Sequence, residues 1–181
     1  KASAGPNPAT YTVNLKVTDD DGGVAHAESN VISVIDVPPT VPLTGAESID
    51  ENQWYSLTIG PITDPGDNDV ASISLIRIDW NGDGIYDQTL ESGQLEELRD
   101  GNTVQLDHFY NDGPAGISKI TVLVLNGDNT FTYNKPFTVN NLAPTASGFV
   151  ATPNQVDAGT PGFVSFISPT DASPLDAASL R

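Results

Sequence analysis

The sequence at residues 11–22 reads YTVNLKVTDDDG, and this stretch indicates the fold class. Val13, Leu15 and Val17 alternate with polar residues, so an extended segment here has one apolar and one polar face. Because successive side chains of a strand point to opposite faces, the pattern is typical of a half-buried antiparallel strand. The acidic run that ends at Gly22 supplies the turn that should follow the strand. We therefore expect an all-β protein.

The same two-residue period recurs further along the chain. Apolar residues alternate at 55–59 and 76–80, and residues 117–125 are apolar on both faces, as in a central strand. Tight turns are predicted by the Asp-Gly and Asn-Gly pairs at 21–22, 81–82, 83–84 and 126–127. No helix is expected, beyond one short turn at residues 94–99.

The chain also repeats itself at the spacing of a whole domain. Residues 13–21 match residues 120–128 at an offset of 107, and residues 49–64 match residues 156–171 at the same offset. A proline-containing linker at 36–40 returns at 141–145. This period suits β-sandwich domains joined by stiff linkers. The sequence thus predicts three pieces: the C-terminal part of a first module (1–38), a complete module (41–142) and the N-terminal part of a third (143–181).

The composition limits the classes of function. The 181 residues carry 24 acidic and 7 basic side chains, a formal net charge of −17, which repels nucleic acid and anionic lipid and favours multivalent cations. With no cysteine, neither a disulfide scaffold nor a thiolate metal site is possible. No signal peptide, long apolar run or lipidation motif is seen, and we expect an internal piece of a longer extracellular or cell-surface protein, without membrane insertion in this segment.

Three motifs of the predicted middle module resemble those of PKD (polycystic kidney disease-like) domains, which are immunoglobulin-like repeats of bacterial surface proteins and secreted hydrolases. IDWNGDG at 78–84 is similar to the family's W-D-F-G-D-G turn, HFY at 108–110 to its H-x-Y, and the stretch from PAG at 114–116 to NGD at 126–128 to its strand-and-turn tail. Residues 11–22 show the tail again, and DEN at 50–52 is similar to repeats of bacterial adhesins.

The resemblance implies tandem immunoglobulin-like Greek-key β-sandwiches, with residues 41–142 forming seven strands in two antiparallel sheets. The residues expected between these sheets, from their alternation and from the repeat, are Ile76, Ile78, Trp80, Ile120, Val122 and Val124. Each terminal piece should then expose an unpaired sheet edge and an apolar face, because neither is a whole sandwich.

One stretch has the ligand spacing of a calcium loop. Its oxygen-bearing positions are Asp79, Asn81, Asp83, the backbone carbonyl of Ile85, and Asp87. Alternate side chains of a tightly turning loop can converge on one ion, and Gly84 permits the turn. Position 12 is Leu90 instead of a bidentate glutamate. The alternative is a plain hairpin turn, since Asn-Gly and Asp-Gly are the commonest tight-turn pairs.

A second hypothesis concerns the joint between the middle and third modules. Loops of a sandwich cluster at its two ends, so head-to-tail stacking should bring the loop at 79–87 towards Asp171 and Asp176 of the third module. Carboxylates cannot crowd together without a counter-charge. A calcium ion would offset the repulsion and stiffen the joint, which gives the picture of a calcium-stiffened rod.

Nothing in the sequence favours catalysis. His26 and His108 lie far apart and have no cysteine partners for a zinc site, and no serine is set in a nucleophile motif. The favoured interpretation is a non-catalytic structural or adhesive repeat segment whose partners are its neighbouring repeats, with other surface proteins or polysaccharide as further candidates. The alternative is an accessory module of a secreted hydrolase that binds polysaccharide or protein. It needs exposed aromatics on a sheet face; we expect Tyr55 in the core and Trp54 over a sandwich edge.

Overall fold

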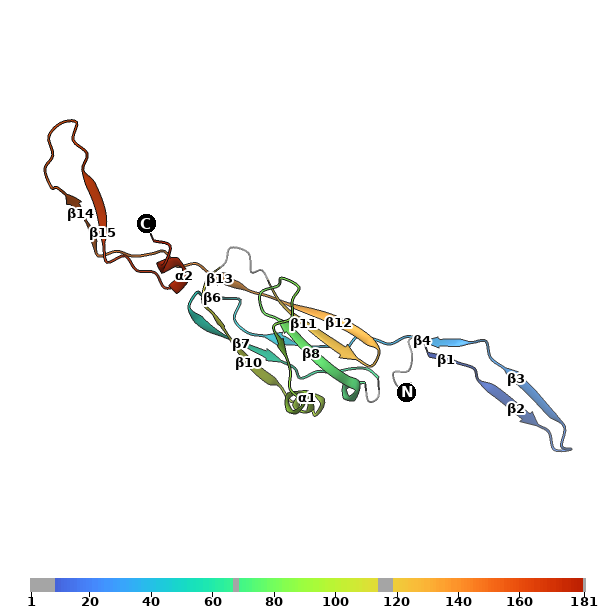
Figure 1. The fold of residues 1–181 in the computed structure, drawn as a ribbon. Coiled ribbons are helices and arrows are strands. Elements are labelled where there is room, and N and C mark those ends of the chain that lie inside the picture. The colour runs from blue at the N-terminus through green and yellow to red at the C-terminus, as the bar shows by residue number, and fades with distance from the viewer. Residues whose placement is uncertain (1–8, 67–68, 114–118, 181) are drawn as a thin grey trace.

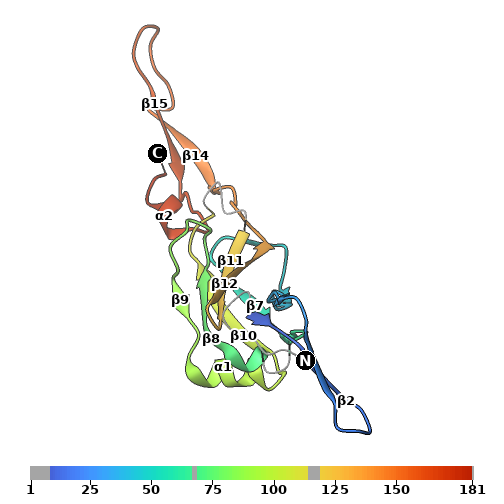
Figure 2. The ribbon, with the colours of Figure 1, turned by 90° about the vertical axis from the view of Figure 1, so that its right-hand side faces the viewer.

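The computed structural model describes residues 9–66, 69–113 and 119–180, and these form β-sheets with a few short helical segments. The predicted all-β class is thereby confirmed. Residues 41–142, called the middle module from here on, form a compact body. The N-terminal strands and the C-terminal hairpin extend from its opposite ends, as both views show (Figures 1 and 2).

Two facing sheets build the middle module. The first has the order β10-β7-β5, made of β10 (Val104–Tyr110), β7 (Gln53–Ile59) and β5 (Leu43–Thr44). The second has the order β12-β11-β8-β9, made of β12 (Asn129–Pro136), β11 (Lys119–Asn126), β8 (Ile73–Asp79) and β9 (Gln88–Thr89). All pairings within these sheets are antiparallel. A separate parallel pair, β6 (Ser48–Asp50) with β13 (Thr138–Asn140), joins the beginning and the end of the module.

The core lies between the two sheets and follows the alternation in the sequence. One sheet contributes Tyr55, Leu57, Ile59, Val104, Leu106 and Tyr110. The other contributes the predicted set, Ile76, Ile78, Ile120, Val122 and Val124, with Trp80 just beyond β8, and all six are at most 1% exposed. Burying each such side chain contributes about 1.5–3 kcal/mol to folding. The indole N–H of Trp80 donates to Gln88 at 3.0 Å, which satisfies its polar atom within the core.

A helix that the sequence analysis did not predict covers one end of this core. Residues 94–99, expected to form one turn at most, belong to α1 (Ser92–Arg99), which has 8 residues. A capping box starts it: the Glu91 side chain accepts from the Gln94 backbone N–H, while the Gln94 side chain accepts from the Glu91 backbone N–H at 2.9 Å. Leu95 and Leu98 anchor it in the core. In the described part of the chain no helix is long and apolar enough to cross a bilayer.

The strand count also differs from the predicted seven. The described part of the middle module contains nine strands, because the first and last of the seven are each split in two, with β9 counted as the edge strand of the second sheet. β5 and β6 part near Gly45, where a Cβ would come within 2.8 Å of the Ser56 carbonyl oxygen. β12 and β13 part after Pro136, which has no N–H for the ladder. Both splits therefore have a local cause.

The terminal pieces are hairpins with exposed apolar side chains. At the N-terminal side, β1 (Ala9–Tyr11) pairs with β4 (Ile32–Val34), and β2 (Asn14–Thr18) pairs with β3 (Val24–Glu28). Val13, Leu15 and Val17 are 56–57% exposed, so the half-burial predicted from the alternation alone is wrong, whereas the exposed apolar face expected of an incomplete terminal piece is confirmed. The reason is that no second sheet lies against the hairpin within the described residues. The apolar alternation is present, but its packing partner is not.

The C-terminal piece repeats the local structure at the start of the middle module. It consists of β14 (Gly148–Thr152), β15 (Phe163–Ile167) and the one-turn helix α2 (Pro174–Ala177). Thr145 and Thr170 form an isolated antiparallel bridge, with N–H to carbonyl distances of 2.8 and 2.7 Å. Thr40 and Thr63 form the same bridge in the middle module, at 2.7 and 3.1 Å. The repeat detected in the sequence is therefore matched by a repeat in backbone pairing.

Candidate metal centre

A buried glutamate lies where the middle module meets the C-terminal piece. Glu51 follows β6 and is 1% exposed. Its Oε1 accepts from the Leu142 backbone N–H at 2.7 Å and its Oε2 from the Gly113 N–H at 3.0 Å. Its own backbone N–H donates to the Asn140 carbonyl at 3.0 Å. One side chain thus joins the β6–β7 turn, the loop after β10 and the linker that leads into the next piece.

Gly113 permits this arrangement. A Cβ at this position would lie 2.9 Å from the Asn141 backbone nitrogen and 3.1 Å from the Asn140 carbonyl carbon. Both neighbours are backbone atoms, which cannot rotate away as a side chain could. The loop after β10 therefore approaches the linker closely enough for Glu51 to bond both.

Two aspartates come from the other side of the joint. Asp171 follows the bridge residue Thr170, and its Oδ1 accepts from the Ser173 N–H at 2.9 Å, which tightens the loop. Ser173 is fully buried and caps α2: its Oγ accepts from the backbone N–H groups of Leu175 at 3.2 Å and Asp176 at 3.3 Å. The cap fixes the first turn of the helix, and that turn presents Asp176.

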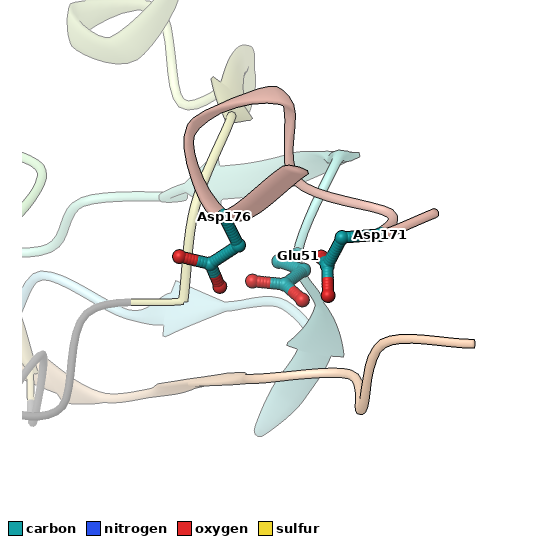
Figure 3. Close-up of side chains that lie close together, drawn as sticks. All are labelled: Glu51, Asp171 and Asp176. Carbon is teal, nitrogen blue, oxygen red and sulfur yellow. The ribbon is translucent and has the colours of Figure 1, made fainter. Parts of the chain in front are cut away.

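The three carboxylates meet at one point. Glu51, Asp171 and Asp176 each offer an oxygen atom, and these atoms lie within 4.8 Å of one another. Figure 3 shows the carboxylates converging, with Glu51 between the two aspartates. Among the described residues this is the one group of three or more acidic, histidine or cysteine side chains with such spacing. It spans the joint, because Glu51 belongs to the middle module and the aspartates to the C-terminal piece.

The surroundings of Asp176 are acidic. Desolvation raises the pKa of Asp176 above the ordinary aspartate value, and the charges of Asp112, Asp171 and Glu51 raise it further. Asp112, in the loop after β10, is therefore a fourth carboxylate near the group. An arrangement of this kind is stabilised either by protonation or by a cation.

The donor set fits a hard divalent cation. It consists of oxygens alone, without nitrogen or sulfur, as calcium and magnesium require. Calcium takes ligands at about 2.3–2.6 Å, so two oxygens bound to the same ion lie at most about 5 Å apart. The 4.8 Å spacing of the group lies within that limit. Carboxylates on separate loops also suit the flexible coordination of calcium better than the rigid octahedron of magnesium.

The predicted calcium loop at residues 79–87 has a different character. Asp79, which ends β8, is 2% exposed. Its Oδ1 accepts from the backbone N–H groups of Asn81 at 3.2 Å and Gly82 at 2.6 Å, and its Oδ2 from that of Gly84 at 2.9 Å. Gly82 and Gly84 have φ of 73° and 90°, left-handed conformations that glycine adopts without strain. The loop's first aspartate is thus already bonded to the loop itself.

The other predicted ligands are also held by the loop. The Asp83 Oδ1 accepts from the Ile85 N–H at 2.7 Å, and Asn81 donates to the Asp83 Oδ2 at 3.1 Å. The Asp87 Oδ2 accepts from the Trp80 N–H at 2.8 Å. Among the described residues, the carboxylates of Asp79, Asp83 and Asp87 do not form a group with the spacing seen at the joint.

The structure separates the two parts of the joint hypothesis. Asp171 and Asp176 do lie together at the joint, but the carboxylate that completes their group is Glu51, not one from the loop at 79–87. That loop is at the same end of the module, since Asp79 pairs with Thr121 near the start of β11, next to the end of β12.

The joint that precedes the middle module carries a related acidic set. Asp64 and Asp69 correspond to Asp171 and Asp176 at the offset of 107. The Asp64 Oδ1 accepts from the Gly66 N–H at 2.8 Å, which is the same bond to the residue two positions ahead that Asp171 makes. Desolvation raises the pKa of Asp64, and the charges of Asp69 and Asp36 add to the effect, against the Gly66 hydrogen bond. Its Oδ2 is buried without a hydrogen-bond partner. Asp67, a further residue of this acidic loop, lies outside the described residues.

Sequence reasoning missed Glu51 and Asp112 as members of the joint. The sequence signal for Glu51 is its place in the Asp50-Glu51-Asn52 stretch, which resembles repeats of bacterial adhesins but does not by itself indicate a metal ligand. Its neighbours in space come from positions far along the chain, and the pairing of β6 with β13 is what brings them together. The chain matches no protein-family model and no curated protein.

Proposed function

We propose that this chain is a segment of tandem immunoglobulin-like repeats, similar to PKD-type modules, in an extracellular or cell-surface protein, with a non-catalytic structural or adhesive role. We further propose that calcium binds at the joint between modules through Glu51, Asp171 and Asp176 and fixes the angle between them.

The strand arrangement supports the module type. A three-stranded sheet faces a four-stranded sheet, and neighbouring strands come from distant parts of the sequence, as in a Greek-key sandwich. The hydroxyl of Tyr110 donates to the Trp80 carbonyl at 2.7 Å, so the H-x-Y stretch fastens one sheet to the strand end of the other. His108 stacks on Trp80 with a centroid distance of 4.9 Å, which gives this histidine a packing role.

The observation that carries the calcium proposal is the meeting of three carboxylates from two modules within 4.8 Å. Like charges at this separation repel strongly where water is partly excluded, and Glu51 is almost fully buried. A bound cation turns this repulsion into attraction between the modules. The joint is then stiff with calcium and loose without it, which suits a protein that holds other parts away from a surface.

The test is a calcium titration of the 181-residue chain by calorimetry, with small-angle scattering in calcium and in chelator. Asp176→Asn should weaken calcium binding about tenfold or more, because a charged ligand is lost without loss of volume. Glu96→Gln, an exposed acid on α1, is the matched control for the change in net charge and should bind calcium as the natural chain does. Scattering should show a change in maximum dimension on chelation, and Asp176→Asn should abolish that change.

The loop at 79–87 provides the alternative location, and Asp83→Asn distinguishes it. If Asp83→Asn weakens calcium binding while Asp176→Asn does not, the metal site is the loop and not the joint. If neither variant changes the affinity and the maximum dimension is constant, calcium has no role in the joint, and the prolines of the linker hold the modules in place.

A further inference from the structure

The outer face of the sheet β10-β7-β5 carries a large exposed aromatic. Trp54, on β7, is 68% exposed, whereas its neighbour Tyr55 is 1% exposed and lies in the core. Within the described part of the middle module the other exposed large apolar side chains are Ile85 and Leu142. A single exposed apolar side chain is common on protein surfaces, so the groups that surround Trp54 decide whether it belongs to a binding surface.

Phe109 supports the indole from the neighbouring strand. Trp54 and Phe109 are directly opposite in the β7–β10 register, and their ring centroids are 5.2 Å apart with an angle of 50° between the planes. Such tilted contacts stabilise aromatic pairs and restrict rotation of the rings. The pair therefore forms a platform, that is, one continuous apolar patch across the two strands.

Hydrogen-bonding groups lie beside the platform on the same face. Ser56 and Asp107 are opposite each other in the next outward position of the two strands, about 7 Å along from Trp54. The Ser56 hydroxyl donates to the Asp107 Oδ1, and the Gln105 amide donates to the same oxygen at 3.3 Å. These three exposed side chains hold one another in place and still present a carboxylate oxygen, an amide and a hydroxyl to solvent.

We propose that Trp54, Phe109, Ser56, Asp107 and Gln105 form a binding surface for an uncharged β-linked oligosaccharide. A pyranose ring with equatorial hydroxyls has axial C–H groups on each face, and these stack on an indole ring. Its vicinal hydroxyls need donors and acceptors at the ring edge, which the Ser56–Asp107–Gln105 set supplies. The formal net charge of −17 disfavours acidic polymers, and a β-1,4 linkage keeps a chain of such sugars extended, with successive rings able to meet a flat sheet face.

Trp54 lies three residues after Glu51 and Phe109 three residues before Asp112, but none of the five side chains of this surface belongs to the acidic group at the joint, so we expect sugar binding to be independent of calcium. The experiment uses the whole chain in chelator and again in calcium, with cellohexaose, laminarihexaose and chitohexaose as neutral probes and an oligomer of polyuronic acid as the charged one. Binding is followed by calorimetry and by acrylamide quenching of tryptophan fluorescence. Because Trp80 is 1% exposed, the quenching reports on Trp54, and a stacked sugar should protect it.

At least one neutral oligomer should bind, in chelator as well as in calcium. Trp54→Ala should weaken this binding about tenfold or more, and Asp107→Asn less. Ile85→Ala, at 69% exposure on the loop after β8, is the matched control and should leave it unchanged. The proposal is overturned if no neutral oligomer binds at millimolar concentration, or if Trp54→Ala binds as tightly as the natural chain. Binding of a decaproline peptide at Trp54 in place of every sugar would make this a peptide surface and overturn it too.

Discussion

The loop at 79–87 and the acidic joint both gather carboxylates at the same end of the middle module, but they satisfy them in different ways. In the loop, Asp79 accepts three backbone N–H bonds from within the next five residues. At the joint, Asp176 faces Asp112, Asp171 and Glu51, all of them acidic. The loop is neutralised locally by peptide dipoles, whereas the joint has carboxylates on several sides.

This difference between the loop and the joint shows when a cluster of carboxylates is structural and when it is a candidate metal site. A carboxylate that accepts several N–H bonds is stable as an anion and determines the shape of its turn without an ion. At the joint, Glu51 accepts two backbone N–H bonds and Asp171 one, but three carboxylates from separate segments also repel one another, and a proton or a cation relieves that repulsion. Aspartates at the spacing of a calcium loop can therefore be structural, while a less conspicuous set from three segments is the better metal ligand.

The largest expected effect is on folding and comes from the loop. Asp79→Ala should lower the free energy of unfolding of the middle module by about 3 kcal/mol or more, because three N–H groups lose their acceptor at a buried position. The measurement is urea unfolding followed by the fluorescence of Trp80.

Asp83→Ala is the control for this prediction, because Asp83 lies in the same loop and is exposed. It should cost about 1 kcal/mol or less. Equal costs for the two variants would contradict the view that Asp79 organises the loop and would place the stabilisation in the turn sequence as a whole.

A smaller effect, with a sign that depends on the solution, is expected at the joint. In chelator, Asp176→Asn should strengthen the contact between α2 and the middle module, because it removes one of the mutually repelling charges. In calcium it should weaken the contact, because a ligand is lost. Hydrogen exchange of the Leu175 and Asp176 amides, which donate to Ser173, reports on the contact directly.

The sign reversal is the decisive feature of this experiment. Slower exchange than in the natural chain under both conditions means that the aspartate is only a source of repulsion. Faster exchange under both means that the carboxylate is needed by the protein itself, without a metal. Either result contradicts a calcium-dependent joint.

Much of the middle module could be predicted because its pattern is local. Alternation located Ile76, Ile78 and Val122 in the core, and a two-residue period is enough to tell the inner face of a strand from the outer. The helix α1 was missed although Glu91 and Gln94 form a capping box, since its two buried leucines gave too weak a helical period. The alternation in β2 alone predicts a buried face that the structure does not have, because burial depends on a second sheet; the repeat, which marks residues 1–38 as an incomplete module, predicts the exposure correctly.

The candidate site was only half predictable for a related reason. Asp171 and Asp176 could be placed at the joint from the repeat, which fixes their position within a module. Glu51 could not, because its role depends on Gly113 and Leu142, which are about sixty and ninety residues away in sequence and adjacent in space. Spacing within one loop predicts a local turn well. It does not predict which loops meet.

The smallest expected effect is a pH dependence of stability. It has opposite signs for His108 in the middle module and for Asp176 at the joint. Burial lowers the pKa of His108, and the nearby Asp87 of the loop only partly opposes this. His108 stacks on Trp80 and meets the edge of Tyr110 at 4.6 Å, so protonation puts a charge among rings. With the folded pKa below the ordinary value of 6.5, the middle module should keep its full stability above pH 6.5 and lose some of it as the pH falls through the lowered pKa.

For Asp176 the sign is reversed, since its raised pKa makes the calcium-free joint more stable as the pH falls towards the ordinary aspartate value. Urea unfolding from pH 7 to pH 4.5 in chelator tests the prediction for His108. Hydrogen exchange of the Leu175 amide, corrected for the intrinsic pH dependence of amide exchange, tests the prediction for Asp176. His108→Gln should flatten the unfolding profile between pH 6.5 and 5, while His26→Gln, at an exposed position of β3, should not. A profile that His108→Gln leaves unchanged would locate the acid sensitivity of the module in its carboxylates.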